Sequence, residues 1–255
     1  MEPFYFESLG TELLGIYHPA SNPSARRGVV ICPPLMTDLS RCYRSIRLLA
    51  EDCASAGYEV LRFDYSGTGD SFGDWDDAGP TQWIEDIVKA TEELSEISGA
   101  ELMTLAGVRF GGLLALHAAE RTKPESLMLW DPVENGSDYR ANLEAIHEGL
   151  ANLHIGLSDA EKRRAALELC GFNIAPWMAS ELEELQAPQS IPDSVERISL
   201  VNTLNCSNFS DIDQLWAREG RKISCRQVEF ECSWNESPEE IMNPSPVLKE
   251  LALCL

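Results

Sequence analysis

An arginine between glycines is the most chemically informative feature of the sequence. Arg109 lies in the run Gly-Val-Arg-Phe-Gly-Gly at residues 107–112, after an apolar strand-like segment and before a helix-like segment of small residues. Glycines around a single residue indicate a tight turn in which backbone segments approach each other closely. A guanidinium stays protonated and offers five donors, so Arg109 at this turn could hold a carboxylate, a phosphate or a sulfate.

Two carboxylates suggest a different role for Arg109. Asp131 and Glu134 follow the next strand-like segment along the chain, and parallel strands that are neighbours in a sheet end at the same edge. A buried ion pair with either residue would neutralise Arg109 and hold the two strand ends together. The two interpretations can coexist if the carboxylate only occupies the place of a ligand.

Apolar periodicity on both sides of the turn predicts alternating strands and helices. Residues 4–7 and 13–18 alternate apolar and polar side chains, which predicts an N-terminal β-hairpin. The strands predicted after it are 28–32, 59–64, 102–107 and 126–131, and the helices between them are 43–56, 81–96 and 111–121. This order is typical of an α/β protein with a mostly parallel central sheet covered by helices.

The pattern changes between residues 134 and 192, where only helical periods occur. The elements predicted from there on are helices at 139–150, 158–170 and 177–185, then strands at 198–202 and 225–230 with a helix at 212–219 between them. We therefore predict an α/β core formed by residues 1–133 and 193–255, with residues 134–192 inserted as a helical cap. Residues 248–255 could form a last helix or an interface strand.

These elements and motifs resemble the α/β-hydrolase superfamily along nearly the whole chain. The turn at 107–112 matches the nucleophile elbow Gly-x-Ser-x-Gly, except that Arg109 stands in place of the serine. The sequences Cys-Pro-Pro-Leu-Met at 32–36 and Asp-Tyr-Ser-Gly-Thr-Gly-Asp-Ser at 64–71 match as well. Within the superfamily the chain is most similar to the serine-aminopeptidase-like branch, and there to the exosortase A system-associated hydrolase 2-type proteins.

The resemblance implies a Ser-His-Asp mechanism of which two parts are missing. Arg109 has no lone pair with which to attack an acyl carbon. The general base would be a histidine after the last strand, but no histidine follows His154 in the sequence. The acid would follow the strand 198–202, as Asp211 or Asp213, and has no base to orient. We therefore expect a degenerate catalytic triad.

The resemblance also implies an oxyanion hole built from backbone amides. In this fold those amides belong to the residue after the elbow, here Phe110, and to the loop after the first buried strand, here Leu35 and Met36. Backbone donors do not depend on side-chain identity, so they can survive the loss of the serine. We expect Arg109 and these amides to bind an anionic or acyl small molecule beneath the cap.

Other residues could supply replacement chemistry. His147 and His154 lie seven residues apart, which places them on one face of a cap helix, where they could act as acid-base groups. Cys32 and Cys206 could provide thiol nucleophiles but have no general base in sight. Buried packing is the simpler interpretation of both cysteines.

Composition excludes several classes of partner. The chain has 255 residues with 20 Lys+Arg against 42 Asp+Glu, a formal net charge of −22, which disfavours nucleic acid and anionic membrane surfaces. The sequence contains no apolar run long enough to span a bilayer and begins without a basic, apolar leader, so we expect a cytoplasmic protein. Eight scattered cysteines without a Cys-x-x-Cys pair predict no metal site, and we expect no cofactor.

The sequence leaves three functions open. The first is a pseudo-hydrolase, or a non-hydrolytic biosynthetic enzyme, that binds an anionic or acyl small molecule. The second is an active esterase, thioesterase or peptidase-like hydrolase with relocated catalytic residues. The third is a non-catalytic scaffold whose partner is a second copy of the chain or another biosynthetic protein.

Overall fold

The central element is an eight-stranded sheet. The computed structural model describes residues 1–22, 26–153, 168–204, 216–217, 220–230, 234 and 244–255. The strands of the sheet are β1 Glu2–Ser8, β2 Thr11–His18, β3 Arg27–Cys32, β4 Glu59–Phe63, β5 Leu102–Val108, β6 Ser126–Trp130, β9 Arg197–Thr203 and β10 Lys222–Val228. Their order is β1-β2-β4-β3-β5-β6-β9-β10, with β2 antiparallel to both of its neighbours and the other pairs parallel. The predicted mostly parallel sheet with an N-terminal hairpin is therefore confirmed.

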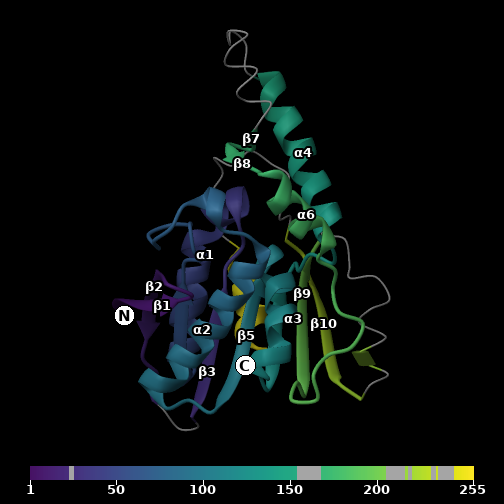
Figure 1. The fold of residues 1–255 in the computed structure, drawn as a ribbon. Helices are drawn as coiled ribbons and strands as arrows, with labels where there is room; N and C mark the ends of the chain where they lie inside the picture. Colours follow the sequence, from purple (N-terminus) through teal and green to yellow (C-terminus); the bar gives the residue numbers. More distant parts are fainter. Residues whose placement is uncertain (23–25, 154–167, 205–215, 218–219, 231–233, 235–243) are drawn as a thin grey trace.

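Helices cover both faces of this sheet (Figure 1). The helices α2 Pro80–Ser98 and α3 Phe110–Thr122 pack on one face, and α1 Met36–Ser55 and α8 Ser245–Ala252 pack on the other. Side chains of a strand alternate between the two faces. On β4, for example, Leu61 and Phe63 join the α2 and α3 side, whereas Val60 joins the α1 and α8 side. Of residues 248–255, those up to Ala252 belong to a helix, α8, and not to a strand.

Helix α1 begins earlier than the predicted start at residue 43. Its first turns contain Thr37, Asp38 and Arg41, which are buried although they are polar. Apolar spacing cannot detect a helix whose inward face is polar, because the prediction counts only apolar residues. The buried polar residues of this segment contribute to the candidate site described below.

The segment between β6 and β9 contains helices and a short hairpin. Its elements are α4 Gly136–Leu153, β7 Glu168–Leu169, β8 Phe172–Asn173 and α6 Pro176–Glu184. The predicted helix at 158–170 is wrong over residues 168–170, where β7 pairs with β8. Cys170 and Gly171 both have positive φ, 53° and 87°, which allows the chain to reverse there. The prediction that this segment contains no strand is therefore wrong.

The segment is attached to the core at its base and at its hairpin. At the base, Gly136 N donates to Leu185 O (2.8 Å) and Ala187 N donates to Glu134 O (2.7 Å). At the hairpin, Trp75 of the 3-10 helix Trp75–Asp77 donates from Nε1 to Asn173 O (2.7 Å). Helix α4 extends beyond the rest of the molecule (Figure 1). The division of the chain at residues 134 and 192 stays a proposal.

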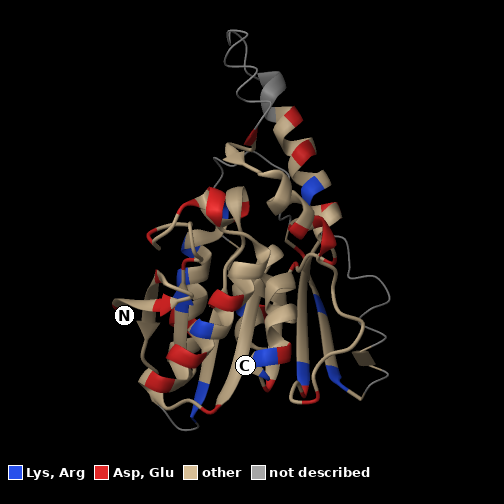
Figure 2. Cartoon of the chain, viewed as in Figure 1, with Lys and Arg blue, Asp and Glu red and all other residues tan. Residues whose placement is uncertain are grey.

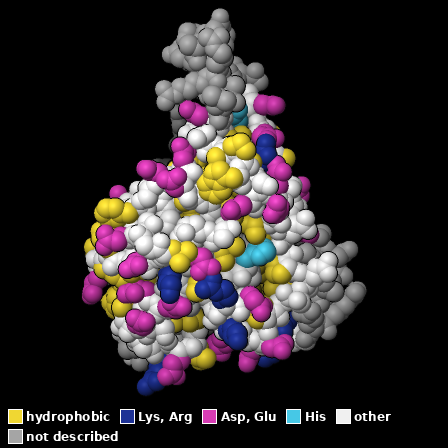
Figure 3. All heavy atoms as spheres, viewed as in Figure 1, with side chains coloured by type: hydrophobic (Ala, Val, Ile, Leu, Met, Phe, Trp, Pro, Cys, Tyr) yellow, Lys and Arg dark blue, Asp and Glu magenta, His cyan; other side chains and the backbone are white. Residues whose placement is uncertain are grey.

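Acidic side chains outnumber basic ones in the sequence, and the structure distributes them widely (Figure 2). Acidic side chains occur on helices and loops throughout the chain (Figure 2) and are spread over the visible face (Figure 3). In the part of the chain that the structure describes, no helix combines the length and apolar character needed to cross a membrane.

The elbow glycines give a stability prediction. A Cβ on Gly111 would overlap the carbonyl oxygens of Cys32 and Pro33, which belong to backbone and cannot move aside. Gly111→Ala should therefore lower the free energy of unfolding by about 1–3 kcal/mol, the usual cost of overpacking. Urea denaturation measures the change.

Gly149→Ala is the matched control for this variant. Gly149 lies in α4, and no heavy atom lies within 4 Å of the position of an added Cβ. Alanine should raise helix stability there by roughly 0.5–1 kcal/mol. Equal effects of the two substitutions would show that the close approach at Gly111 is not a constraint.

Candidate functional site

Arg109 occupies a strained turn between β5 and α3. Its φ of 51° and ψ of −124° lie in a region that L-residues rarely adopt. The turn is held by hydrogen bonds from Arg109 N to Trp130 O (3.0 Å) and from Gly112 N to Arg109 O (2.9 Å). Gly107 lies so close to Gly112 that a Cβ would overlap its backbone. The elbow predicted at residues 107–112 is therefore present, with an arginine at its tip.

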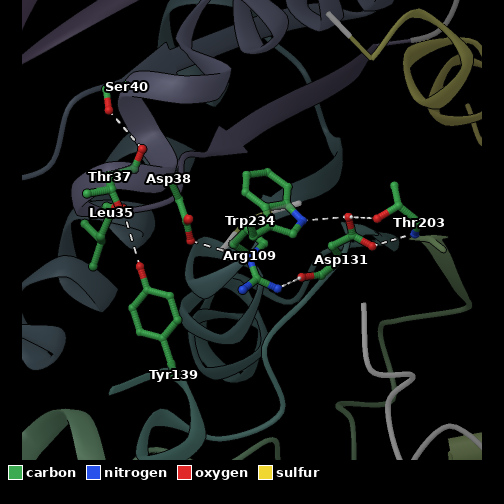
Figure 4. Close-up of polar contacts among 9 residues, drawn as sticks. All are labelled: Leu35, Thr37, Asp38, Ser40, Arg109, Asp131, Tyr139, Thr203 and Trp234. Carbon is green, nitrogen blue, oxygen red and sulfur yellow. Dashed lines mark hydrogen bonds and ion pairs between the residues drawn. The ribbon is translucent and has the colours of Figure 1, made fainter. Parts of the chain in front are cut away.

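The Arg109 side chain is buried among three segments of the chain (Figure 4). Its Nε lies 3.4 Å from Asp38 Oδ2, and its Nη1 donates to the backbone oxygen of Asp131 (3.3 Å). The guanidinium carbon lies 5.0 Å from the centre of the Trp234 ring. Arg109 is only 8% exposed. Its charge is thus compensated by a carboxylate, a carbonyl and an aromatic face.

The ion-pair partner differs from the prediction. Among the described residues the ion pair of Arg109 is with Asp38, in the first turn of α1, rather than with Asp131 or Glu134. Asp131 contributes its backbone oxygen instead, because its carboxylate is already occupied. Asp38 was not predicted to lie here, because the helix that carries it was predicted to begin later.

The carboxylate of Asp131 is the centre of a second group of contacts. Its Oδ1 accepts from Thr203 N (2.7 Å), and its Oδ2 accepts from Thr203 Oγ1 (2.8 Å). Oδ2 also accepts from the Trp234 indole Nε1 (2.9 Å). These bonds join the end of β6, the end of β9 and the segment after β10 (Figure 4). Asp131 is 1% exposed, so the bonds are shielded from water.

Arg109, Trp234 and Asp131 form one connected series. Asp131 accepts a hydrogen bond from the ring nitrogen of Trp234, and the face of that ring packs on the Arg109 side chain. A Ser-His-Asp triad has the same order of elbow residue, aromatic ring and carboxylate, but there the ring makes hydrogen bonds to both partners. Here neither member can accept a proton, because indole is a donor only and guanidinium stays protonated. Sequence reasoning recognised the missing histidine but did not predict these contacts of Trp234.

The predicted oxyanion corner is closed by a residue from α4. The Tyr139 ring stacks on Phe110 at 4.9 Å between centroids, and its hydroxyl donates to Leu35 O (3.4 Å). Leu35, Met36 and Phe110 are all buried, and Met36 has a positive φ of 53°. Leu35 and Met36 lie at the start of α1 and Phe110 at the start of α3, while their role in binding stays a prediction. Tyr139 was not predicted to lie among them.

Burial governs the ionisation of the acidic groups in this corner. Burial raises the pKa of Asp38 above its usual value, although Arg109, Arg41 and Tyr139 all favour the carboxylate form. The pKa of the Tyr139 hydroxyl is raised well above its ordinary value, first by burial and then by the Asp38 charge. Tyr139 is therefore protonated near neutral pH, and its hydroxyl can donate a hydrogen bond.

The remaining candidates have structural contacts or lie outside the described residues. His147 Nδ1 accepts from Cys170 N (3.1 Å), which ties α4 to the β7–β8 turn. Burial raises the pKa of the Cys32 thiol far above neutral pH, so the thiolate that attack requires does not form. The candidates His154, Asp211, Asp213 and Cys206 lie outside the described residues. Within the described ranges no group of three or more His, Cys, Asp or Glu residues could hold a metal ion.

The sheet order, the helices on both faces and the elbow between β5 and α3 define the α/β-hydrolase fold. Solved structures agree: a Pseudomonas aeruginosa protein, PA2218, superposes with a TM-score of 0.64 at 15% identity, covering 100% of this chain and 93% of that one. Mouse α/β-hydrolase domain-containing protein 10 superposes with a TM-score of 0.56 at 18% identity, covering 90% and 89%. The predicted fold is therefore confirmed.

Sequence similarity points to one group of named proteins. The chain is 33% identical over 90 residues to human palmitoyl-protein thioesterase ABHD10, mitochondrial, which covers 35% of this chain and 28% of that protein. The rat protein of that name is 28% identical over 111 residues, covering 44% and 35%. The chain thus matches about a third of the length of these relatives. No family model matches the chain.

The Asp38–Arg109 pair gives a second stability prediction. Arg109→Leu should lower the free energy of unfolding by about 3–5 kcal/mol, because it leaves the Asp38 carboxylate buried without this partner. The double variant Arg109→Leu/Asp38→Leu should regain part of that loss, since neither charge remains. Urea denaturation of the single and double variants measures the coupling.

A surface pair of the same helix provides the control. Arg47 and Glu51 form an exposed ion pair on α1, and Arg47→Leu should change stability by less than about 1 kcal/mol. If the double variant at Arg109 and Asp38 lost as much stability as the two single variants combined, the two side chains would not be energetically coupled.

Proposed function

We propose that this chain is a non-hydrolytic protein of the α/β-hydrolase fold, a pseudo-hydrolase that acts by binding. The observation that carries the proposal is the series Arg109, Trp234 and Asp131 in the place of a Ser-His-Asp triad. Acyl transfer needs a nucleophile with a free lone pair and a base that takes its proton. Neither the guanidinium nor the indole can perform either step.

In this proposal the elbow has a structural role instead of a catalytic one. Arg109 connects α1 through Asp38, β6 through the Asp131 carbonyl and the segment after β10 through Trp234. Tyr139 adds α4 by stacking on Phe110. The former catalytic centre thus acts as a joint that holds the cap segment and the C-terminal part of the chain on the sheet.

Binding of an anionic or acyl small molecule is the second candidate function. Asp38 is a carboxylate already paired with Arg109, and burial raises its pKa. Protonation of Asp38 would release Arg109 for an external carboxylate or for a polarised acyl carbonyl. In this interpretation Asp38 occupies the place of the ligand, and a non-hydrolytic biosynthetic step could use the same corner.

Hydrolysis of acyl-protein thioesters, for which the human and rat relatives are named, is the alternative. It would require catalytic residues other than Arg109 and Trp234, because these two cannot act as nucleophile and base. The exosortase-associated branch, a cytoplasmic location and a homo-oligomeric or biosynthetic protein partner likewise stay proposals.

Reconstruction of the triad tests the proposal. The native chain should hydrolyse p-nitrophenyl butyrate no faster than buffer does. The double variant Arg109→Ser/Trp234→His places a nucleophile and a base beside Asp131 and should raise the rate at least about tenfold, a small share of what a complete triad supplies. Release of p-nitrophenol, followed by absorbance, measures both rates.

Arg109→Ser/Trp234→Phe is the matched control, because it carries the serine without the base and should stay at the background rate. Saturable hydrolysis by the native chain that persists in Arg109→Ala would contradict the proposal and favour relocated catalytic residues. Circular dichroism of each variant establishes that it is folded.

A further inference from the structure

The outer edge of strand β1 is open. In the order of the sheet β1 lies at one end, so β2 is its neighbour on one side and no described strand lies on the other. The hairpin of β1 and β2 forms the margin of the molecule near the N-terminus (Figure 1). An edge strand presents a row of unpaired amides and carbonyls, which is a template for another strand.

The turn of the hairpin determines which backbone groups of β1 face outward. The two turn residues have positive φ, 46° and 83°, as in a type I′ turn, so the flanking residues Ser8 and Thr11 form a hydrogen-bonded pair. Bonded and non-bonded pairs alternate along an antiparallel ladder. The amides and carbonyls of Tyr5 and Glu7 therefore point away from β2, and so does the carbonyl of Pro3, which has no amide hydrogen.

Exposed aromatic side chains accompany this edge. Tyr5 is 51% exposed and Phe72 is 56% exposed, and their rings are in contact, with 5.6 Å between centroids. In the hairpin Tyr5 lies opposite Leu14 of β2, which is half-buried. Exposed apolar side chains beside an open strand edge are typical of a contact surface for another chain.

We propose that β1 pairs with β1 of a second copy of this chain, in antiparallel orientation about a two-fold axis at Tyr5. Backbone hydrogen bonds would join the two Tyr5 residues to each other, and the Glu7 amide of each copy to the Pro3 carbonyl of the other, about four bonds in all. Because Pro3 has no amide hydrogen, the Glu7 carbonyl is left to water. The arrangement is closed, since each β1 edge is covered by the other.

The sequence of β1 is complementary to itself in this register. Phe4 of each copy would lie opposite Phe6 of the other, and the two Tyr5 rings would lie side by side. Cross-strand aromatic pairs stabilise antiparallel ladders. Phe4 and Phe6 already pack on the core cluster of the α2 side, so their positions are fixed before the second copy arrives. This self-complementary order favours a second copy of the chain over an unrelated strand.

Charge favours the same register. Glu7 would lie opposite Pro3 and Glu2 opposite Ser8, so no two carboxylates face each other. A shift by two residues toward the turn would bring the two Glu7 side chains to diagonal positions on one face, where like charges repel. The register centred on Tyr5 therefore keeps the acidic ends of β1 apart.

The proposed interface is separate from the Arg109 corner. Strands β2, β4 and β3 lie between β1 and β5, the strand that leads into the elbow. Dimerisation would stand or fall without any effect on the absence of hydrolysis, so the two proposals fail independently.

Sedimentation equilibrium of the native chain is the primary test. Between about 1 and 200 µM the average mass should rise from that of one chain toward that of two, because one strand with a few aromatic side chains makes a small, reversible interface. Raising NaCl from about 50 to about 500 mM should strengthen association at least about twofold, because salt screens the repulsion between copies with a net charge of −22. A chain that stays monomeric over this range, or association that salt weakens, would overturn the proposal.

Variants at the two-fold axis locate the interface. Tyr5→Lys removes the aromatic pair and places two ammonium groups side by side, so it should weaken dimerisation by about tenfold or more. Leu253→Lys is the matched control, because it introduces the same side chain at a residue that is 65% exposed and follows α8, and it should leave dimerisation unchanged. An undiminished dimer of Tyr5→Lys, shown by circular dichroism to be folded, would contradict the assignment.

Dityrosine formation tests the register. Ruthenium-sensitised photo-oxidation with persulfate should link the Tyr5 rings of two copies, and mass spectrometry of the digested dimer should find Tyr5 joined to Tyr5. Tyr5→Phe keeps the aromatic ring, so it should dimerise like the native chain and lose this product. A cross-linked dimer that lacks the Tyr5–Tyr5 product would show that another surface is used.

Discussion

The burial of one permanent charge determines the arrangement around the elbow. Arg109 lies at a turn whose glycines fix the backbone, so its guanidinium points into the region where α1, β6 and the segment after β10 meet. Removing such an ion from water costs several kcal/mol. Attraction to Asp38 at 3.4 Å gives back about 5 kcal/mol at an effective dielectric constant of 20. The Asp131 carbonyl and the Trp234 ring add to this compensation.

The same arrangement explains why the elbow keeps its strain. A residue in a rarely populated conformation costs about 1–3 kcal/mol and persists only where surrounding contacts determine it. In a hydrolase that conformation exposes the nucleophile. Here it directs Arg109 toward Asp38 and the Asp131 carbonyl. Segments distant in sequence are thereby joined, so the turn has a structural role.

The sequence predicted the sheet and the elbow because apolar runs and glycines express local requirements directly. The buried strands 28–32 and 102–107 match β3 and β5 within a residue. The start of α1 was missed because Thr37, Asp38 and Arg41 face inward although they are polar. The β7–β8 hairpin was missed because each strand has only two residues. The partners of Arg109 depend on long-range packing, and no local pattern near Asp38 or Trp234 encodes it.

The attachment of the segment between β6 and β9 has a consequence for how the fold can vary. Hydrogen bonds between Gly136 and Leu185 and between Glu134 and Ala187 place its two ends side by side, where β6 and β9 are already neighbours. A segment that leaves and re-enters at one point can change length without shifting the sheet. Doubling such a loop costs only about 0.6 kcal/mol in closure entropy. Evolution can therefore exchange this part of the molecule while the remaining architecture is inherited intact.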